Sequence, residues 1–103
     1  MHENLEFTHE KGSNKPADIT VYALSTCGFC RRALQFLRKN DIDFKYIYVD
    51  KQDSSVRIKI KRDLSETYKD HRLGFPFCVI DEGEDIIVGF TEEKWKKALL
   101  DRN

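Results

Sequence analysis

The chain has 103 residues, of which 40% are hydrophobic and 35% are charged. This length suits one compact domain with one core and excludes two domains of ordinary size. Because 18 Lys and Arg balance 18 Asp and Glu, no overall charge favours nucleic acid or an anionic membrane as a partner. No apolar run approaches the roughly 20 residues that span a bilayer, and residues 1–16 lack the apolar core of a secretory signal. We therefore expect a cytoplasmic protein that recognises its partners locally.

The N-terminal residues 1–17 differ in composition from the rest of the chain. They are polar and contain several turn-forming residues, so we predict a flexible leader. Leu5, Phe7 and His9 alternate with polar residues, a pattern that also fits a short extra edge strand. The folded domain is expected to span residues 18–103.

Two apolar runs and the segment between them predict a strand-helix-strand unit. Residues 19–24 (ITVYAL) form a short, partly β-branched run that is typical of a strand buried on both faces. A second strand is predicted over residues 44–49 (FKYIYV). Between them, apolar residues recur three and four positions apart, which predicts a helix ending near residue 40 (Cys30, Ala33, Leu34, Leu37).

The next segment is expected to be a second helix that follows turn and capping residues at 50–55. Its apolar residues fall four apart from Val56 to Tyr68. Val56, Ile58 and Ile60 also alternate, as they would in a strand. The length of the segment and its content of Lys, Arg and Glu favour the helix.

The C-terminal part predicts a hairpin and a last helix. Residues 77–80 and 86–88 are short apolar runs joined by an acidic turn. Thr91 is expected to cap a helix whose inner face carries Trp95, Ala98 and Leu99. The resulting order β-α-β-α-β-β-α predicts an α/β fold with a mixed four-stranded sheet flanked by helices.

Cys27 and Cys30 lie at the turn between the first strand and the first helix. Thiols attack as thiolates, and the unpaired N–H groups of a helix N-terminus favour negative charge at Cys27. Arg31 is expected to tune the acidity of this pair. Cys30 lies one helical turn further on and should be more buried, so we predict that Cys27 attacks a disulfide and that Cys30 resolves the mixed disulfide.

Two other readings of the cysteine pair have less support. A tetrahedral zinc site needs four ligands, and Cys78 and the histidines show no ligand spacing, so no metal is expected. A static disulfide over so small a ring would constrain the unfolded chain little. Cys78 is predicted to be a small buried hydrophobe, with a third redox thiol as the alternative.

With this cysteine pair and a proline before the third strand, residues 18–103 resemble the glutaredoxins, small redox proteins with a thioredoxin-like fold. The resemblance is carried by three groups of residues (Cys27, Gly28, Phe29 and Cys30; Phe75 and Pro76; Gly89 and Phe90). It implies a cis peptide between Phe75 and Pro76, in a loop that lies against the cysteines. It also implies a surface that binds glutathione or a protein segment (Phe29, Phe75, Pro76, Gly89, Phe90, Thr91).

The resemblance implies an oxidoreductase that reduces protein disulfides or glutathione mixed disulfides and takes part in electron transport. We expect a monomer without a tightly bound cofactor. Glutathione is a candidate reductant. The lysine that glutaredoxins usually carry before the first cysteine is missing from residues 23–26 (ALST). One alternative is therefore a glutathione-independent electron donor recharged by a thioredoxin reductase. Another is an iron–sulfur cluster carrier that dimerises through Cys27.

Overall fold

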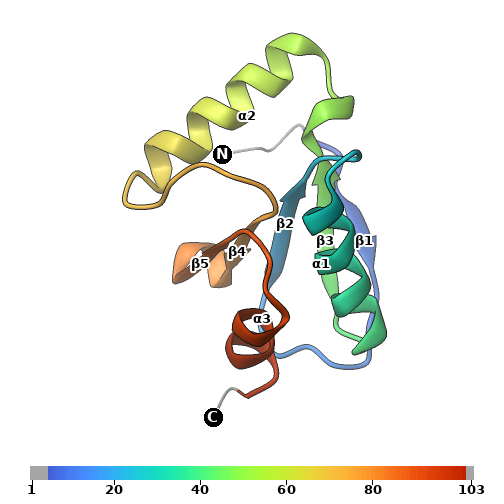
Figure 1. The fold of residues 1–103 in the computed structure, drawn as a ribbon. Helices are drawn as coiled ribbons and strands as arrows, with labels where there is room; N and C mark the ends of the chain where they lie inside the picture. The colour runs from blue at the N-terminus through green and yellow to red at the C-terminus, as the bar shows by residue number, and fades with distance from the viewer. Residues whose placement is uncertain (1–4, 102–103) are drawn as a thin grey trace.

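The computed structural model describes residues 5–101, which form one mixed sheet with helices on both faces (Figure 1). The strands are β1 (Thr8–Glu10), β2 (Ile19–Ala23), β3 (Phe44–Tyr48), β4 (Phe77–Ile80) and β5 (Asp85–Val88). The helices are α1 (Gly28–Lys39), α2 (Ser54–Thr67) and α3 (Glu92–Leu99), with short 3₁₀ turns at Val49–Lys51 and Asp81–Gly83.

The strand order in the sheet is β1-β3-β2-β4-β5. β2 runs parallel to β3 and antiparallel to β4, and β4 and β5 form the predicted antiparallel hairpin. α1 is the crossover between the two parallel strands. This arrangement confirms the expected α/β fold of thioredoxin-like type.

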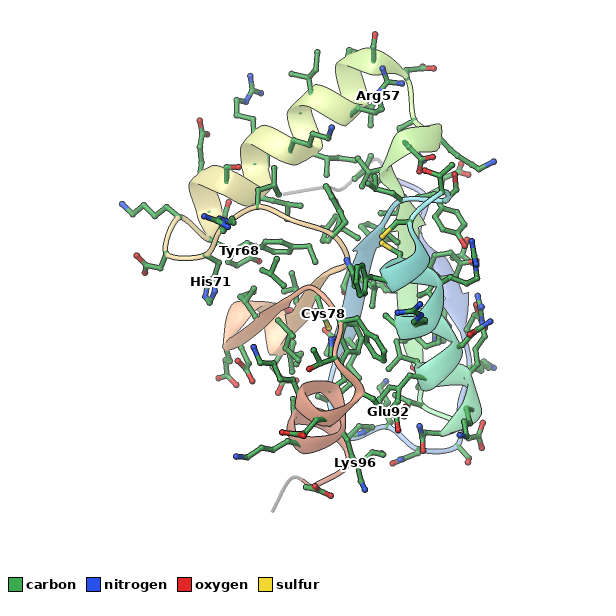
Figure 2. All side chains as sticks on the ribbon, viewed as in Figure 1. Arg57, Tyr68, His71, Cys78, Glu92 and Lys96 are labelled. Carbon is green, nitrogen blue, oxygen red and sulfur yellow. The ribbon has the colours of Figure 1, made fainter. Side chains whose placement is uncertain are left out.

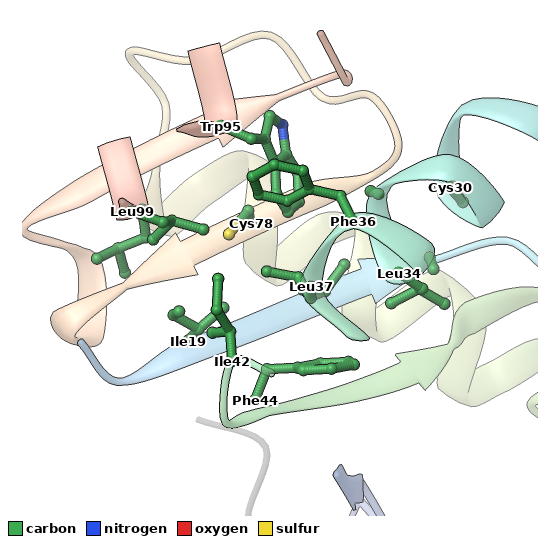
Figure 3. Close-up of a cluster of buried hydrophobic side chains, with 14 of the residues drawn as sticks. Ile19, Cys30, Leu34, Phe36, Leu37, Ile42, Phe44, Cys78, Trp95 and Leu99 are labelled. Atoms are coloured by element: carbon green, nitrogen blue, oxygen red, sulfur yellow. The ribbon is translucent and has the colours of Figure 1, made fainter. Parts of the chain in front are cut away.

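Each face of the sheet has its own core. The core under α1 and α3 contains Val21 of β2 and Trp95 of α3, and Figure 3 shows part of this cluster. The core under α2 contains Tyr22 of β2 together with Ile60 and Leu64. Successive residues of a strand point to opposite faces, so the continuous apolar run of β2 contributes to both cores.

The segment from Val56 to Ile60 is helical, which confirms the predicted helix and rules out the strand alternative. It forms the first half of α2, in which Ile60 is buried while Ile58 is 64% exposed. Successive residues of a helix are rotated by about 100°, so only one stripe of side chains along α2 faces the sheet.

The sheet has five strands rather than four, because the N-terminal segment adds β1 antiparallel to β3. Arg38 of α1 binds Glu10 with two of its nitrogens, Nε at 2.8 Å from Oε1 and Nη2 at 2.5 Å from Oε2. The Gly12 N–H donates to Asp43 Oδ1 at 3.1 Å. A Cβ at Gly12 would lie 2.4 Å from the carbonyl oxygen of Asp41, so this close approach needs glycine. The flexibility of residues 1–17 stays a prediction.

None of the helices within residues 5–101 is long and apolar enough to cross a bilayer.

Candidate active site

Cys27 and Cys30 lie where the chain leaves β2 and enters α1. Cys27 is the N-cap of α1 and has an extended backbone (φ −91°, ψ 119°). Its Sγ accepts a hydrogen bond from the Cys30 backbone N–H at 3.2 Å. Cys27 is half-buried, Cys30 is completely buried, and both are free thiols. The turn thus sets an accessible sulfur at a helix N-terminus beside an inaccessible thiol.

The environment of Cys30 keeps its thiol protonated. Its Sγ accepts a hydrogen bond from the Leu24 N–H at 3.4 Å, which by itself lowers the pKa of Cys30. Burial, and then the hydrogen bond with the Cys27 side chain, raise the pKa of Cys30 to about 12. At neutral pH the reduced protein therefore holds Cys30 as a thiol, and Cys27 is the sulfur that solvent can reach.

Asp50 contributes to this site, and the sequence analysis assigned it only to a turn. The Ser25 N–H donates to Asp50 Oδ1 at 2.8 Å, and the Ser25 hydroxyl donates to Oδ2 at 2.5 Å. Burial alone would raise the pKa of Asp50, but these two hydrogen bonds hold it below its usual range. The resulting carboxylate adds a small upward contribution to the pKa of Cys30. No local spacing marks this pair, because the two residues are brought together only by the parallel pairing of β2 and β3.

The loop before β4 lies against Cys27, as expected. The Phe75–Pro76 peptide is cis, which confirms that prediction. The Cys27 Sγ lies 4.0 Å from the carbonyl oxygen of Phe75. Within residues 5–101, the backbone N–H of Phe75 has no acceptor, and its carbonyl has no donor nearer than this sulfur. A stretch of backbone beside the reactive sulfur is therefore open to pairing.

Gly89 is joined to the same loop by its backbone. Its N–H donates to the Pro76 carbonyl at 2.9 Å, and its own carbonyl accepts from Trp95 Nε1 at 2.9 Å. Gly89 has a φ of +83°, a region that L side chains rarely adopt. This glycine therefore links the Pro76 loop to α3.

Phe90 and Thr91 are both engaged within the fold. The Phe90 ring packs against Phe36 of α1 and Trp95 of α3, with centroid separations of 6.0 and 5.4 Å. The Thr91 hydroxyl accepts from the Lys94 N–H at 3.3 Å and caps α3, as expected. Their binding to substrate stays a prediction.

Phe29 is the exposed aromatic side chain next to the cysteines. It is 56% exposed, and the Arg32 guanidinium lies over its ring at 5.4 Å from the centroid. The Arg31 side chain is exposed and, in the described part of the chain, forms no hydrogen bond or ion pair with Cys27. The effect of Arg31 on the acidity of the pair stays a prediction.

Cys78 lies away from the reactive pair, in the core under α1 and α3. It is completely buried and packs in the same cluster as Trp95 and Leu99 (Figure 3). Phe77 points to the other face of the sheet, as the strand geometry predicts. Burial raises the pKa of the Cys78 thiol, so it behaves as the small buried hydrophobe that was predicted.

Metal ligands do not gather in the described structure. Among residues 5–101, no group of three or more His, Cys, Asp and Glu is placed to hold an ion.

The sequence model of the glutaredoxin family matches residues 19–84, which is more than half of the chain. The chain belongs to the glutaredoxin family. Among solved structures, it is similar to the glutaredoxin from Methanosarcina mazei Go1, with 26% identity, a TM-score of 0.73, and coverage of 92% of this chain and 88% of that one. It is also similar to Methanosarcina acetivorans methanoredoxin, with 28% identity, a TM-score of 0.73, and coverage of 85% and 88%. The glutaredoxin from Archaeoglobus fulgidus gives 30% identity, a TM-score of 0.70, and coverage of 84% and 88%.

No curated protein sequence matches the chain significantly. The glutaredoxin fold expected from the sequence is confirmed by the family match and by these structures. Glutaredoxin family membership implies thiol–disulfide oxidoreductase chemistry, and Cys27 and Cys30 have the spacing of a CxxC motif.

Proposed function

We propose that the protein reduces disulfides in protein substrates, or mixed disulfides of glutathione, with Cys27 as the nucleophile and Cys30 as the resolving thiol. The observation that carries this proposal is the unequal exposure of two adjacent sulfurs. Cys27 is accessible at a helix N-terminus, and Cys30 is buried with a pKa raised to about 12. Only Cys27 can meet a substrate disulfide first.

The reaction has two exchanges. Cys27, as its thiolate, attacks one sulfur of the substrate disulfide, forms a mixed disulfide, and releases the other substrate sulfur as a thiolate that takes up a proton. Cys30 then loses its proton and attacks the Cys27 sulfur, which forms the Cys27–Cys30 disulfide and releases the second substrate thiol. Two electrons and two protons pass from the cysteine pair to the substrate.

The loop beside Cys27 supplies a place for the substrate backbone. An extended segment that lies along Phe75 can pair with its open N–H and carbonyl, which stand next to the Cys27 sulfur. The exposed ring of Phe29 offers an apolar contact on the helix side of the same sulfur. Phe29 and Phe75 are therefore the residues that we propose touch the substrate.

The oxidised pair must be reduced again by two electrons from an external thiol. We propose glutathione or a thioredoxin-reductase-type protein in this role, and no tightly bound cofactor. A glutaredoxin usually has a lysine for glutathione in the segment that here reads Ala23, Leu24, Ser25 and Thr26. The absence of this lysine supports the thioredoxin-reductase-type reductant.

The test is a coupled NADPH assay on an insulin disulfide and on a glutathione mixed disulfide, with each reductant system in turn. Cys27→Ser should abolish turnover with every substrate, because no accessible thiol remains. Cys30→Ser should stop protein-disulfide turnover and trap a mixed disulfide visible by mass spectrometry. Cys78→Ser is the matched control, since Cys78 lies in the core, and it should keep the activity of any protein that folds.

Normal turnover by Cys27→Ser would sink the proposal. A coloured dimer after anaerobic reconstitution with iron and sulfide, in a protein that reduces no disulfide, would support the cluster-carrier alternative instead.

A further inference from the structure

A groove with a volume of about 440 Å³ runs between α1 and α3. Its floor is apolar, because Phe36 and Phe90 pack together there. Its walls carry charged side chains from both helices, and Figure 2 shows Glu92 and Lys96 on the side of α3 toward α1. The residues that matter for its chemistry are Arg32, Phe36, Lys39, Phe90, Glu92 and Lys96.

The groove has an excess of positive charge in a chain whose net charge is zero. Arg32, Lys39 and Lys96 face a single carboxylate, that of Glu92. Within residues 5–101, none of these three cations has an ion-pair partner within 4.0 Å. The neighbouring Arg38, in contrast, is bound to Glu10. An incoming anionic group would therefore meet cations that are not already paired.

The groove begins on α1 at Arg32, five residues after the N-cap Cys27. The Arg32 guanidinium stacks over Phe29, which is the second residue after Cys27. The 12 residues of α1 span about 18 Å at 1.5 Å per residue. An extended peptide covers about 3.3 Å per residue. A peptide that runs along α1 from Cys27 therefore needs about two residues to reach Arg32 and about six to reach Lys39.

We propose that this groove binds an acidic segment of the disulfide-bearing substrate polypeptide, between about two and six residues from the reacting cysteine. Its carboxylates face Arg32, Lys39 and Lys96, and one apolar side chain of the segment lies on Phe36 and Phe90. The inference rests on the proposed function, because it assigns a substrate class to that same site.

The experiment compares synthetic peptides in which one cysteine forms a mixed disulfide with 2-mercaptoethanol. One peptide carries three Glu and one Leu at two to six residues from the cysteine, and its partner carries Gln in place of each Glu. Both are made with the segment before and after the cysteine. At low ionic strength we expect kcat/KM to be about fivefold higher for the acidic peptide in one of the two orientations, the scale of two partly exposed ion pairs.

The variants separate the groove from general charge. Lys39→Gln/Lys96→Gln should bring the acidic-to-neutral ratio of kcat/KM below two. Lys69→Gln/Lys97→Gln removes the same charge from exposed lysines that do not line the groove, and it should leave the ratio unchanged. A wild-type ratio near one in both orientations, or an equal fall in both double variants, overturns the inference.

A binding measurement needs no turnover. A fluorescein-labelled acidic peptide with Ser in place of Cys should bind the reduced wild-type protein at least threefold more tightly than the Lys39→Gln/Lys96→Gln variant, by anisotropy. Reduction of all peptides without an acidic preference overturns the groove and leaves the proposed function intact. Failure to reduce any peptide overturns the proposed function, and anisotropy then decides the preference of the groove by itself.

Discussion

Asp50 holds Ser25 through two hydrogen bonds, one from its backbone N–H and one from its hydroxyl, at 2.8 and 2.5 Å. Ser25 stands two residues before Cys27, and its neighbour Leu24 donates to the sulfur of Cys30. The Asp50 carboxylate, which does not belong to α1, therefore holds the turn that contains Cys27. It also brings a negative charge close to the buried thiol.

Asp50→Asn should lower the pKa of Cys30. Burial and the hydrogen bond with Cys27 are the larger reasons why this pKa is raised, and the Asp50 charge adds to them. The amide oxygen still accepts from the Ser25 N–H, whereas the amide nitrogen is a donor, so the Ser25 hydroxyl must turn to accept from it while the charge is lost. In a Cys78→Ala background, the pH dependence of Cys30 alkylation, followed by mass spectrometry, should show the upper thiol titration moving to lower pH.

Asp53→Asn is the matched control for this charge. Asp53 is exposed and precedes α2 without a side-chain capping hydrogen bond. The Asp53→Asn substitution should leave the pKa of the upper thiol titration unchanged. An upper titration that stays fixed or rises in Asp50→Asn would show that the carboxylate does not act on Cys30.

Cys78 should make the protein less stable in alkali. Burial raises the pKa of Cys78 in the folded state, whereas an unfolded cysteine titrates near pH 8.5. Its contribution to stability is therefore complete below pH 8.5 and is lost as the pH rises. Between pH 7 and 10, the free energy of unfolding should fall by about 2 kcal/mol more in the wild type than in Cys78→Ala.

Urea unfolding under reducing conditions at pH 7 and pH 10 measures this difference. Cys78→Ala should itself cost about 1 kcal/mol at pH 7, from the cavity that it leaves. Parallel losses of stability in the two proteins would exclude Cys78 as a source of the pH dependence.

Trp95→Phe should destabilise the fold by about 2 kcal/mol. It removes the donor to the Gly89 carbonyl and part of the buried ring surface. Far-UV circular dichroism should follow the urea transition, because Trp95 is the single tryptophan of the chain. Phe90→Leu serves as the comparison, since it alters the ring packing and keeps the hydrogen bond. A loss below about 0.5 kcal/mol in Trp95→Phe would mean that this hydrogen bond does not hold the loop.

The contact between Glu10 and Arg38 should be measurable but small. A double-mutant cycle with Glu10→Gln and Arg38→Gln should give a coupling of about 0.5–1 kcal/mol, because both side chains are partly exposed. The coupling should shrink in 1 M NaCl. A coupling that is zero at low salt would show that the Glu10–Arg38 ion pair does not help to hold β1 on the sheet.

Local patterns were sufficient for the helices and the inner strands. The apolar spacing of α1, the Thr91 cap of α3 and the continuous run of β2 are properties of neighbouring residues, and the structure has them where they were expected. The cis peptide at Pro76 came from the family resemblance, since no local pattern distinguishes it from a trans proline.

Long-range polar contacts could not be predicted in the same way. The partners Ser25 and Asp50, and likewise Glu10 and Arg38, lie 25 and 28 positions apart in the chain. A polar side chain on the surface of a predicted element can pair with many others, and only the packed sheet decides which one it meets. The fifth strand was predicted only as an alternative to a flexible leader. Its three polar residues carry little apolar periodicity of their own.

The position of β1 has a consequence for aggregation. Without it, β3 would be the edge of the sheet, and its sequence FKYIY combines aromatic and β-branched residues with the open backbone that templates strand addition. β1 covers that edge and presents the short polar sequence THE in its place. Removal of residues 1–10 should therefore promote ordered aggregates, and thioflavin fluorescence during prolonged incubation would reveal them.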